Sequence, residues 1–195
     1  MLTRYTPSMS KISTLGRVVL ALSLIVHAAG QDVPFRITEF LAVNANGLQD
    51  VDDDYSDWIE IHNQSDELQN LAGWHLSDDP DNPTKWAVPS ANVAPDGYSV
   101  IIASGKNSNS IFQLEINTNF TLSRPGGYLA LADPEGNLVQ ELIYPDQQPD
   151  VSYGVDEDGQ LAYYRPTPGG PNEVSFSGLV ADTKFSVDRG FFTEG

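Results

Sequence analysis

The chain has 195 residues, 40% of them hydrophobic, which suits one packed domain with appendages and is too apolar for a disordered chain. It contains no cysteine, so disulfides, thiolate metal sites and cysteine nucleophiles are excluded. The formal net charge is −17, and so acidic a surface repels nucleic acid and anionic lipid. Such a surface favours cations, or it only keeps the protein soluble.

The N-terminal segment has the pattern of an export signal. A start with three Lys or Arg residues and no acid leads into apolar residues 18–26, and small residues at 28–30 precede Gln31. We therefore expect residues 1–30 to be a signal peptide and the protein to be secreted. The apolar run is too short for a bilayer, which needs about 20 residues, so no transmembrane segment is expected after cleavage. An uncleaved interfacial anchor is the alternative. Cleavage would leave seven basic residues against 27 acidic ones, a net charge of −20.

After residue 31, short apolar or alternating runs are separated by Gly, Pro, Asn and Asp, and no long segment has a helical period. The predicted strands lie at 35–43, 57–63, 71–76, 85–89 (as an edge strand), 97–104, within 120–133, at 138–144 and at 160–166. Strands at intervals of about ten residues are typical of an all-β sandwich or barrel.

The segment DWIEIHN, residues 57–63, shows the clearest strand pattern. Ile59 and Ile61 fall on one face, and Trp58 and Glu60 fall on the other. This alternation predicts a half-buried strand with its two isoleucines in the core.

Residues 127–133 and 138–144 are joined by a short turn, which predicts an antiparallel hairpin. The first of these runs is apolar on both faces, as in a central strand. The polar exceptions in the second run, Gln140 and Glu141, are expected to contact solvent.

The Pro- and Gly-rich residues 166–172 cannot form a strand and predict a linker that closes the domain. We place the domain at 31–175. Residues 176–195 are interpreted as a linker or as the truncated start of a further β-module.

An acidic loop precedes the strand at 57–63. Asp50, Asp52 and Asp54 alternate, so a looping backbone can aim their oxygens at one centre, and Asp57 can add another ligand. These four residues are the predicted metal site, with calcium as the candidate cofactor. The alternative is a solvated acidic turn. An EF-hand is rejected, because its glycine and its bidentate glutamate have no counterparts here.

The sequence offers few residues in catalytic patterns. His62 and His75, the two histidines after residue 31, lie on predicted strands and favour surface or packing roles. There is no Gly-x-Ser-x-Gly elbow and no kinase signature, and residues 104–107 lack the upstream spacing of a phosphate loop. We therefore predict that the chain is not an enzyme.

Aromatic residues offer one further hypothesis. Trp58, Trp74, Trp86, Tyr98 and Tyr128 would make a carbohydrate platform if they were exposed. Core aromatics are more common in sandwiches, and we expect Trp74 to be buried.

The order of several motifs resembles the lamin tail domain family. They are ITEF at 37–40, DWIEIHN at 57–63, LAGWHLSD at 71–78, KW at 85–86, PDGY at 95–98 and PGGPN at 168–172. The acidic stretch 52–58 is similar to the secreted bacterial members, and no coiled-coil heptads precede it, which excludes a filament-forming lamin.

This resemblance implies an immunoglobulin-like antiparallel β-sandwich that acts as a non-catalytic accessory module. Its expected role is binding, surface attachment or presentation of a neighbouring domain, with an unidentified protein or carbohydrate surface as partner. The oligomeric state is left open. The alternative is the N-terminal accessory fragment of a larger extracellular enzyme, a hydrolase or a CotH-like spore-coat kinase.

Overall fold

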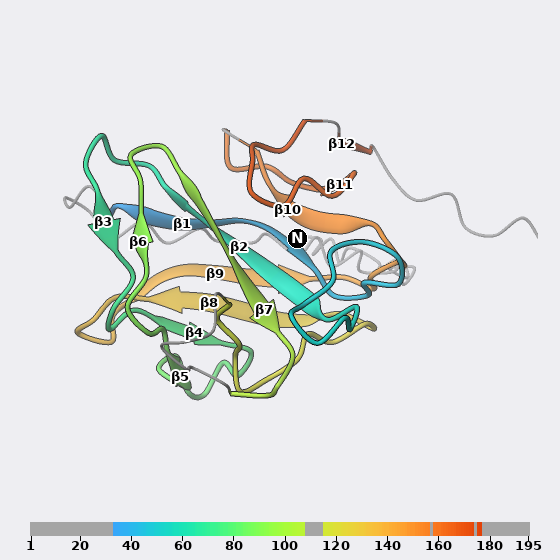
Figure 1. Ribbon diagram of the computed structural model, residues 1–195, viewed down its shortest axis with the longest axis horizontal. Coiled ribbons are helices and arrows are strands. Elements are labelled where there is room, and N and C mark those ends of the chain that lie inside the picture. Colours follow the sequence, from blue (N-terminus) through green and yellow to red (C-terminus); the bar gives the residue numbers. More distant parts are fainter. Residues whose placement is uncertain (1–32, 108–114, 157, 174, 177–195) are drawn as a thin grey trace, which may run out of the picture.

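The computed structural model describes residues 33–107, 115–156, 158–173 and 175–176, and these residues form an immunoglobulin-like β-sandwich (Figure 1). All of its secondary structure is β, with no helix in the ranges given, so the predicted fold class is confirmed. Accordingly, no membrane-spanning helix occurs in the described part of the chain. The proposed signal peptide at 1–30 and nearly all of the segment 176–195 lie outside the described residues.

Two sheets and a small two-stranded ribbon make up the fold. The larger sheet has the order β12-β11-β10-β1-β2-β7, the second has the order β5-β4-β8-β9, and β3 pairs with β6. The strands are β1 (Phe35–Leu41), β2 (Asp57–Asn63), β3 (Gln69–Asn70), β4 (His75–Ser77), β5 (Trp86–Ala87), β6 (Asn92–Val93), β7 (Tyr98–Ala103), β8 (Gly127–Ala132), β9 (Leu138–Tyr144), β10 (Ser152–Val155), β11 (Leu161–Tyr164) and β12 (Ser175–Phe176).

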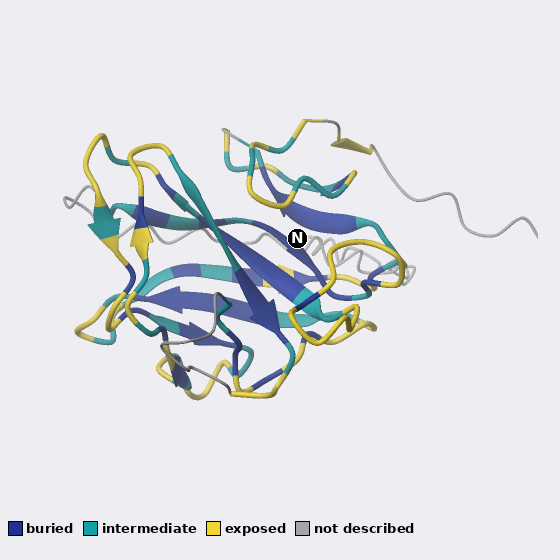
Figure 2. Cartoon of the chain, in the orientation of Figure 1, coloured by how far each residue is buried: buried dark blue, intermediate teal, exposed yellow. Residues whose placement is uncertain are grey.

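The main core lies between the two sheets, where the strands are darkest in Figure 2. Ile59 and Ile61 are fully buried there, as the alternation in DWIEIHN predicted. Each such aliphatic side chain contributes about 1.5–3 kcal/mol by leaving water. The large side chains of the two sheets that are fully buried in this core are Phe35, Ile37, Phe40, Ile59, Ile61, Leu76, Ile101, Leu129, Leu131 and Leu142.

Strand β2 corrects the prediction of a half-buried strand. It is an interior strand between β1 and β7, and its second face is buried too. Trp58 packs with Leu41 and Ile102 in a separate small cluster, and Glu60 is fully buried under residues 167–172. The alternation was correct, but it could not show that other segments cover the outer face.

A bulge in β1 sets which side chains face outward. The register against β2 shifts between Ile37 and Glu39, which leaves Thr38 as the extra residue and turns Glu39 outward. Strand β10 runs against the bulge at Gly154, where a Cβ atom would lie 2.1 Å from the Thr38 carbonyl oxygen. Only glycine allows β10 to approach this closely.

Strands β8 and β9 form the predicted antiparallel hairpin, with β8 in the interior of its sheet. The expected exposure of Gln140 is wrong, because its side chain is buried and ties the two sheets together. Its Oε1 accepts a hydrogen bond from the Ile37 amide at 2.7 Å, and its Nε2 donates to the Ile37 carbonyl at 3.0 Å. Glu141 is half-buried.

Other boundaries differ from the sequence prediction. Most of the predicted strand at 71–76 is a turn before β4, closed by a 3.0 Å bond from the Trp74 amide to the Leu71 carbonyl, with Gly73 at φ 82°. The expected edge strand within 85–89 is present as β5. Strand β10 was missed, because its four residues include a glycine that weakens the strand pattern.

Candidate binding loop

The β1–β2 loop, residues 42–56, carries three of the four predicted metal ligands and is organised around Asp50. The Asp50 carboxylate accepts hydrogen bonds from the amides of Asp52 (2.9 Å) and Asp54 (3.0 Å) and from the Ser56 hydroxyl (2.8 Å). The Asp50 amide donates to the Asp54 carbonyl at 2.9 Å. Asp53 takes a left-handed φ of 64°, which aspartate tolerates. Local bonds of this kind are why aspartates favour tight turns.

The structure brings three of the four predicted ligands together. Carboxylate oxygens of Asp50, Asp52 and Asp54 lie within 4.8 Å of one another. The Lys106 ammonium donates to all three, at 2.8, 2.6 and 3.2 Å respectively. Asp57 is outside this group, and its carboxylate accepts a hydrogen bond from the Leu122 amide at 3.3 Å.

These contacts shift the titration of the loop. Burial alone would raise the pKa of Asp50, but hydrogen bonds from Lys106, Ser56 and backbone amides outweigh it and lower that pKa to about 2. The same three carboxylates raise the pKa of Lys106. Asp57 behaves oppositely, because burial raises its pKa to about 6 against the hydrogen bonds that it accepts. The loop therefore keeps its ammonium and its anionic centre charged at neutral pH.

Further bonds hold the loop against the sandwich. Asn44 donates to the carbonyls of Leu48 (2.6 Å) and Ser56 (2.8 Å) and so spans the loop. Asp150, beyond β9, accepts from the backbone amides at 45 (2.7 Å) and 46 (2.9 Å). The loop is thus fixed both within itself and to a distant part of the chain.

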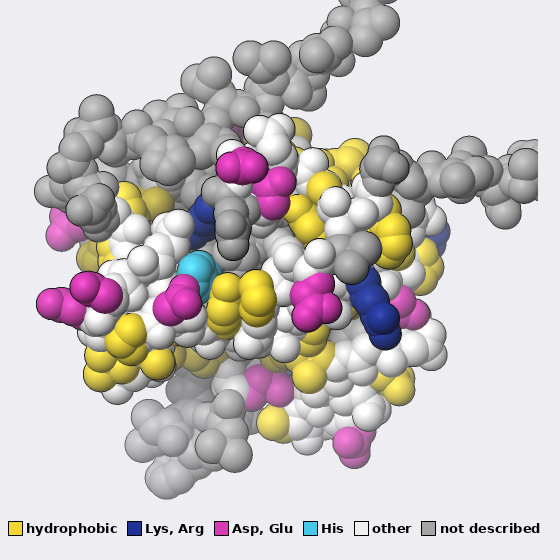
Figure 3. All heavy atoms as spheres, turned by 90° about the horizontal axis from the view of Figure 1, so that it is seen from above, with side chains coloured by type: hydrophobic (Ala, Val, Ile, Leu, Met, Phe, Trp, Pro, Cys, Tyr) yellow, Lys and Arg dark blue, Asp and Glu magenta, His cyan; other side chains and the backbone are white. Residues whose placement is uncertain are grey.

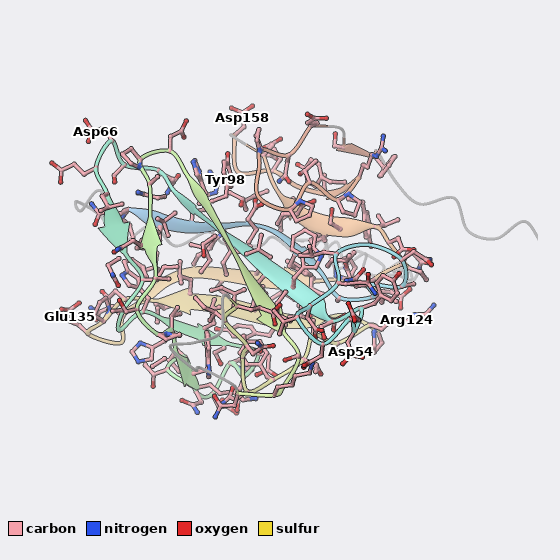
Figure 4. All side chains as sticks on the ribbon, in the orientation of Figure 1. Asp54, Asp66, Tyr98, Arg124, Glu135 and Asp158 are labelled. Carbon is pink, nitrogen blue, oxygen red and sulfur yellow. The ribbon has the colours of Figure 1, made fainter. Side chains whose placement is uncertain are left out.

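The loop presents apolar side chains among its carboxylates. Leu48, Val51 and Tyr55 are 38%, 55% and 46% exposed. Figure 4 shows Asp54 where this loop approaches the end of β7. A fixed loop with exposed apolar groups and an acidic rim can contact a partner surface without first being ordered.

Lys106 was not identified from the sequence as part of this site. It follows β7 and was considered only within the rejected phosphate loop at 104–107. Lys106 is separated from the aspartates by 52 to 56 positions, so no local spacing in the sequence indicates the contact. The scarcity of basic residues in so acidic a chain was the only available signal.

Elsewhere on the sandwich, the predicted aromatic platform does not form. Trp58, Trp74 and Trp86 are all buried, which confirms the core placement of Trp74 and removes three of the five proposed platform residues from the surface. His62 stacks on Tyr98 with ring centroids 4.4 Å apart.

The two histidines lie in packing and hydrogen-bonding positions, as their sequence positions predicted. His62 is bonded to Asp96 at 2.9 Å, and His75 Nδ1 lies 3.2 Å from the Asp133 carbonyl oxygen.

Sequence reasoning also missed two buried carboxylates on the outer face of the larger sheet. Glu39 and Glu60 are paired across β1 and β2 and are both fully buried. Burial raises the pKa of Glu60 to about 7 and raises the pKa of Glu39 as well. The available signal was the apolar character of the same face further along the two strands, where Leu41 and Trp58 lie. An apolar face indicates that other segments cover it.

Acidic side chains are not confined to these places. In the view of Figure 3 they are scattered among hydrophobic and neutral groups rather than gathered in one patch. The loop is therefore distinguished by its geometry and its exposed apolar groups, not by charge alone.

Comparison with known proteins gives one finding. A family model described as the Lamin Tail Domain matches residues 30–146, which is more than half of the chain. The comparison with curated proteins found no match. The matched region ends before β10, although β10, β11 and β12 continue the larger sheet beyond it.

Proposed function

Because the chain belongs to the lamin tail domain family, we propose that it is a secreted, non-catalytic sandwich module that attaches to a partner through the β1–β2 loop. The observation that carries this proposal is a loop fixed by Asp50 and Lys106 that nevertheless exposes Leu48, Val51 and Tyr55. Attachment of this kind would let the module anchor, or present, whatever is joined to it.

The chemistry of the loop suggests its partner. Carboxylates around exposed apolar groups complement a protein surface whose apolar centre is surrounded by Lys and Arg side chains. A carbohydrate partner is less well supported, because the three tryptophans that would stack on sugar rings are buried. The fixed loop also favours binding, since little conformational entropy remains to be lost.

Attachment can be tested by fractionating producing cells. We expect the secreted chain to be retained at the cell surface and released by high salt, which screens the acidic rim. Replacing Leu48, Val51 and Tyr55 together with serine should move the protein into the medium. The matched control replaces Leu68 and Ile143, which are 63% and 62% exposed away from the loop. Equal retention of both variants would contradict the proposal.

Export is tested separately, by N-terminal sequencing of the secreted material. We expect the mature chain to begin near Gln31. Intact Met1 on a chain confined to the cytosol would contradict secretion and leave the fold unaffected.

The second candidate function is that of an N-terminal accessory part of a larger extracellular enzyme, a CotH-like kinase or a hydrolase. The similarity of the acidic stretch 52–58 to secreted bacterial members supports it. The sequence of the gene beyond codon 195 distinguishes the two, since a catalytic domain in the same reading frame would establish the second.

Calcium binding at Asp50, Asp52 and Asp54 is proposed as an addition to either role. Three convergent carboxylates support it, but calcium takes six to eight oxygen ligands and would have to replace the Lys106 ammonium. Binding would then couple calcium to the position of Lys106.

A further inference from the structure

The buried pair Glu39 and Glu60 has an unusual environment for two carboxylates. The residues are directly opposite each other on β1 and β2, and like charges at such a position repel. Neither forms an ion pair with a Lys, Arg or His among the described residues. A buried carboxylate is tolerated only where hydrogen bonds replace its water, so its donors decide the stability of this region.

Most of those donors come from one segment, residues 167–172, which we call the clasp. Thr167 donates to Glu39 through its amide (3.1 Å to Oε2) and through its hydroxyl (3.1 Å). The amides of Gly169 and Gly170 donate to Glu60 at 2.7 and 3.3 Å. Among the described residues, two further donors come from the strands.

Those two are the Ser152 hydroxyl, which donates to Glu39, and the Thr38 hydroxyl, which donates to Glu60 at 2.6 Å. The far end of the clasp is fastened as well, because Asn172 donates to the carbonyls of Thr38 and Val155 at 3.0 Å each. Removing the clasp would thus expose both carboxylates and leave each with one hydroxyl donor.

Closing the clasp is coupled to proton binding. Burial raises the pKa of Glu60 to about 7, with the nearby charge of Glu39 as a further contribution, although the clasp amides act in the opposite direction. In an open state, water would reach the pair and both groups would titrate as ordinary glutamates. The closed state therefore binds protons more tightly, so raising the pH favours opening.

The charged and titratable groups around the pair do not reverse this direction of the pH dependence. Tyr164 on β11 is electrostatically coupled to Glu39, and its own pKa is raised by burial, so it stays neutral while the pair titrates. Arg36 and Asp156 lie beyond it and contact each other, through the Arg36 guanidinium and the Asp156 carbonyl.

We propose that residues 167–172 form a pH-dependent clasp, closed while Glu39 and Glu60 retain a proton between them and opened when both are ionised. Opening would release the segment that leads from β11 to β12. The use of this release in presenting a neighbouring domain rests on the proposed function above, whereas the clasp itself does not.

The test is amide hydrogen exchange of the full chain, resolved by NMR and corrected for the intrinsic pH dependence of exchange. We expect the protection factors of Thr167, Gly169 and Gly170 to fall between pH 5 and pH 8, by up to about tenfold per pH unit for each proton released. Amides of Leu129 and Leu131 in β8 should remain more strongly protected than the clasp amides throughout this range. Constant protection of the clasp amides across this range would overturn the proposal.

Three variants separate the clasp from general destabilisation. Glu60→Gln keeps an acceptor for the glycine amides without the charge, so the clasp should stay protected at pH 8 with a flatter pH profile. Gly169→Pro removes a donor and cannot adopt the φ of 87°, so the clasp should open at every pH while β8 stays protected. Glu173→Gln, an exposed neighbour, should behave as the parent.

A parental pH profile in Glu60→Gln would overturn the proposal, as would unchanged protection of Thr167 and Gly170 in Gly169→Pro. All of these measurements are made without a partner. A negative result would therefore overturn the clasp but not the proposed attachment through the β1–β2 loop. Likewise, a negative result in the attachment experiment would not bear on the clasp.

Discussion

The acidic cluster of the β1–β2 loop and the Glu39–Glu60 pair under the clasp both gather carboxylates, but they stabilise them by different means. In the loop a cation, the Lys106 ammonium, contacts three aspartates, of which Asp50 is buried and Asp52 and Asp54 are exposed. Under the clasp the carboxylates are buried, and they accept hydrogen bonds from hydroxyls and backbone amides. The pKa shifts accordingly differ in sign, with Asp50 lowered to about 2 and Glu60 raised to about 7.

Burial without a cation favours the protonated carboxyl, whereas a neighbouring lysine favours the ionised one. The Glu39–Glu60 pair therefore stabilises the fold most in acid, whereas the acidic cluster of the β1–β2 loop stabilises it most at higher pH.

The importance of the donors is tested by moving a carboxylate one residue along β2. Ile59 is as fully buried as Glu60 but faces the apolar core, where no clasp amide can reach it. Ile59→Asp should cost several kcal/mol, against a total stability of about 5–15 kcal/mol, and unfold the domain. Circular dichroism and thermal melting would check this. A soluble variant with a cooperative melt would show that a carboxylate buried on β2 does not need hydrogen-bond donors.

The opposite pKa shifts predict opposite pH dependences. The pKa of Glu60 is raised from 4.5 to about 7, so its contribution is present below pH 4.5 and is lost as the pH rises through about 7. At about 1.4 kcal/mol per pKa unit, the loss is at most about 3 kcal/mol. Asp50 acts in the other direction, because its contribution is present above pH 3.8 and is lost as the pH falls through about 2.

Urea unfolding between pH 2 and pH 8 would check both slopes. Glu60→Gln should flatten the profile above pH 4.5 and leave the acid side unchanged. If the stability of Glu60→Gln fell above pH 4.5 as steeply as that of the parent, other groups, such as Asp57 with its pKa of about 6, would dominate the profile.

The contribution of the Lys106 ammonium to the acidic cluster can be tested by removing it. Lys106→Met keeps most of the aliphatic stem but leaves Asp50, Asp52 and Asp54 without their ammonium, and should cost about 1 kcal/mol because two of the three aspartates are exposed. Lys85→Met is the matched control, since Lys85 pairs with one carboxylate, that of Asp78 at 2.5 Å. Thermal melts at low and high salt would check this. Equal losses in the two variants would mean that the three-carboxylate arrangement adds nothing.

Calcium binding carries the smallest expected effect. We expect millimolar calcium to raise the melting temperature more than magnesium does at matched ionic strength. A calcium concentration equal to the dissociation constant stabilises the fold by about 0.4 kcal/mol. Asp52→Asn combined with Asp54→Asn should abolish the difference, and Lys106→Met should enlarge it by removing the competing ammonium. Equal shifts with calcium and magnesium in the parent protein would identify the loop as an ordinary acidic turn.

Local sequence was sufficient for the features that depend on neighbouring residues. Alternation placed Ile59 and Ile61 in the core, and the short turn between β8 and β9 defined their hairpin. Spacing also predicted that Asp50, Asp52 and Asp54 would converge, because a tight turn brings alternate side chains together. The order of short motifs pointed to the family and, through it, to the sandwich.

Only the tertiary structure decided what covers each face and which charge meets which. Glu60 alternates like a solvent-facing residue, yet residues 109 and 110 positions later in the chain fold over it. Gln140 is buried because the second sheet brings it to Ile37, 103 positions away. Lys106 reaches the aspartates because β7 pairs antiparallel with β2, which places the end of β7 beside the β1–β2 loop. Such contacts depend on strand order and on the path of the connecting segments, and neither leaves a periodic trace in the local sequence.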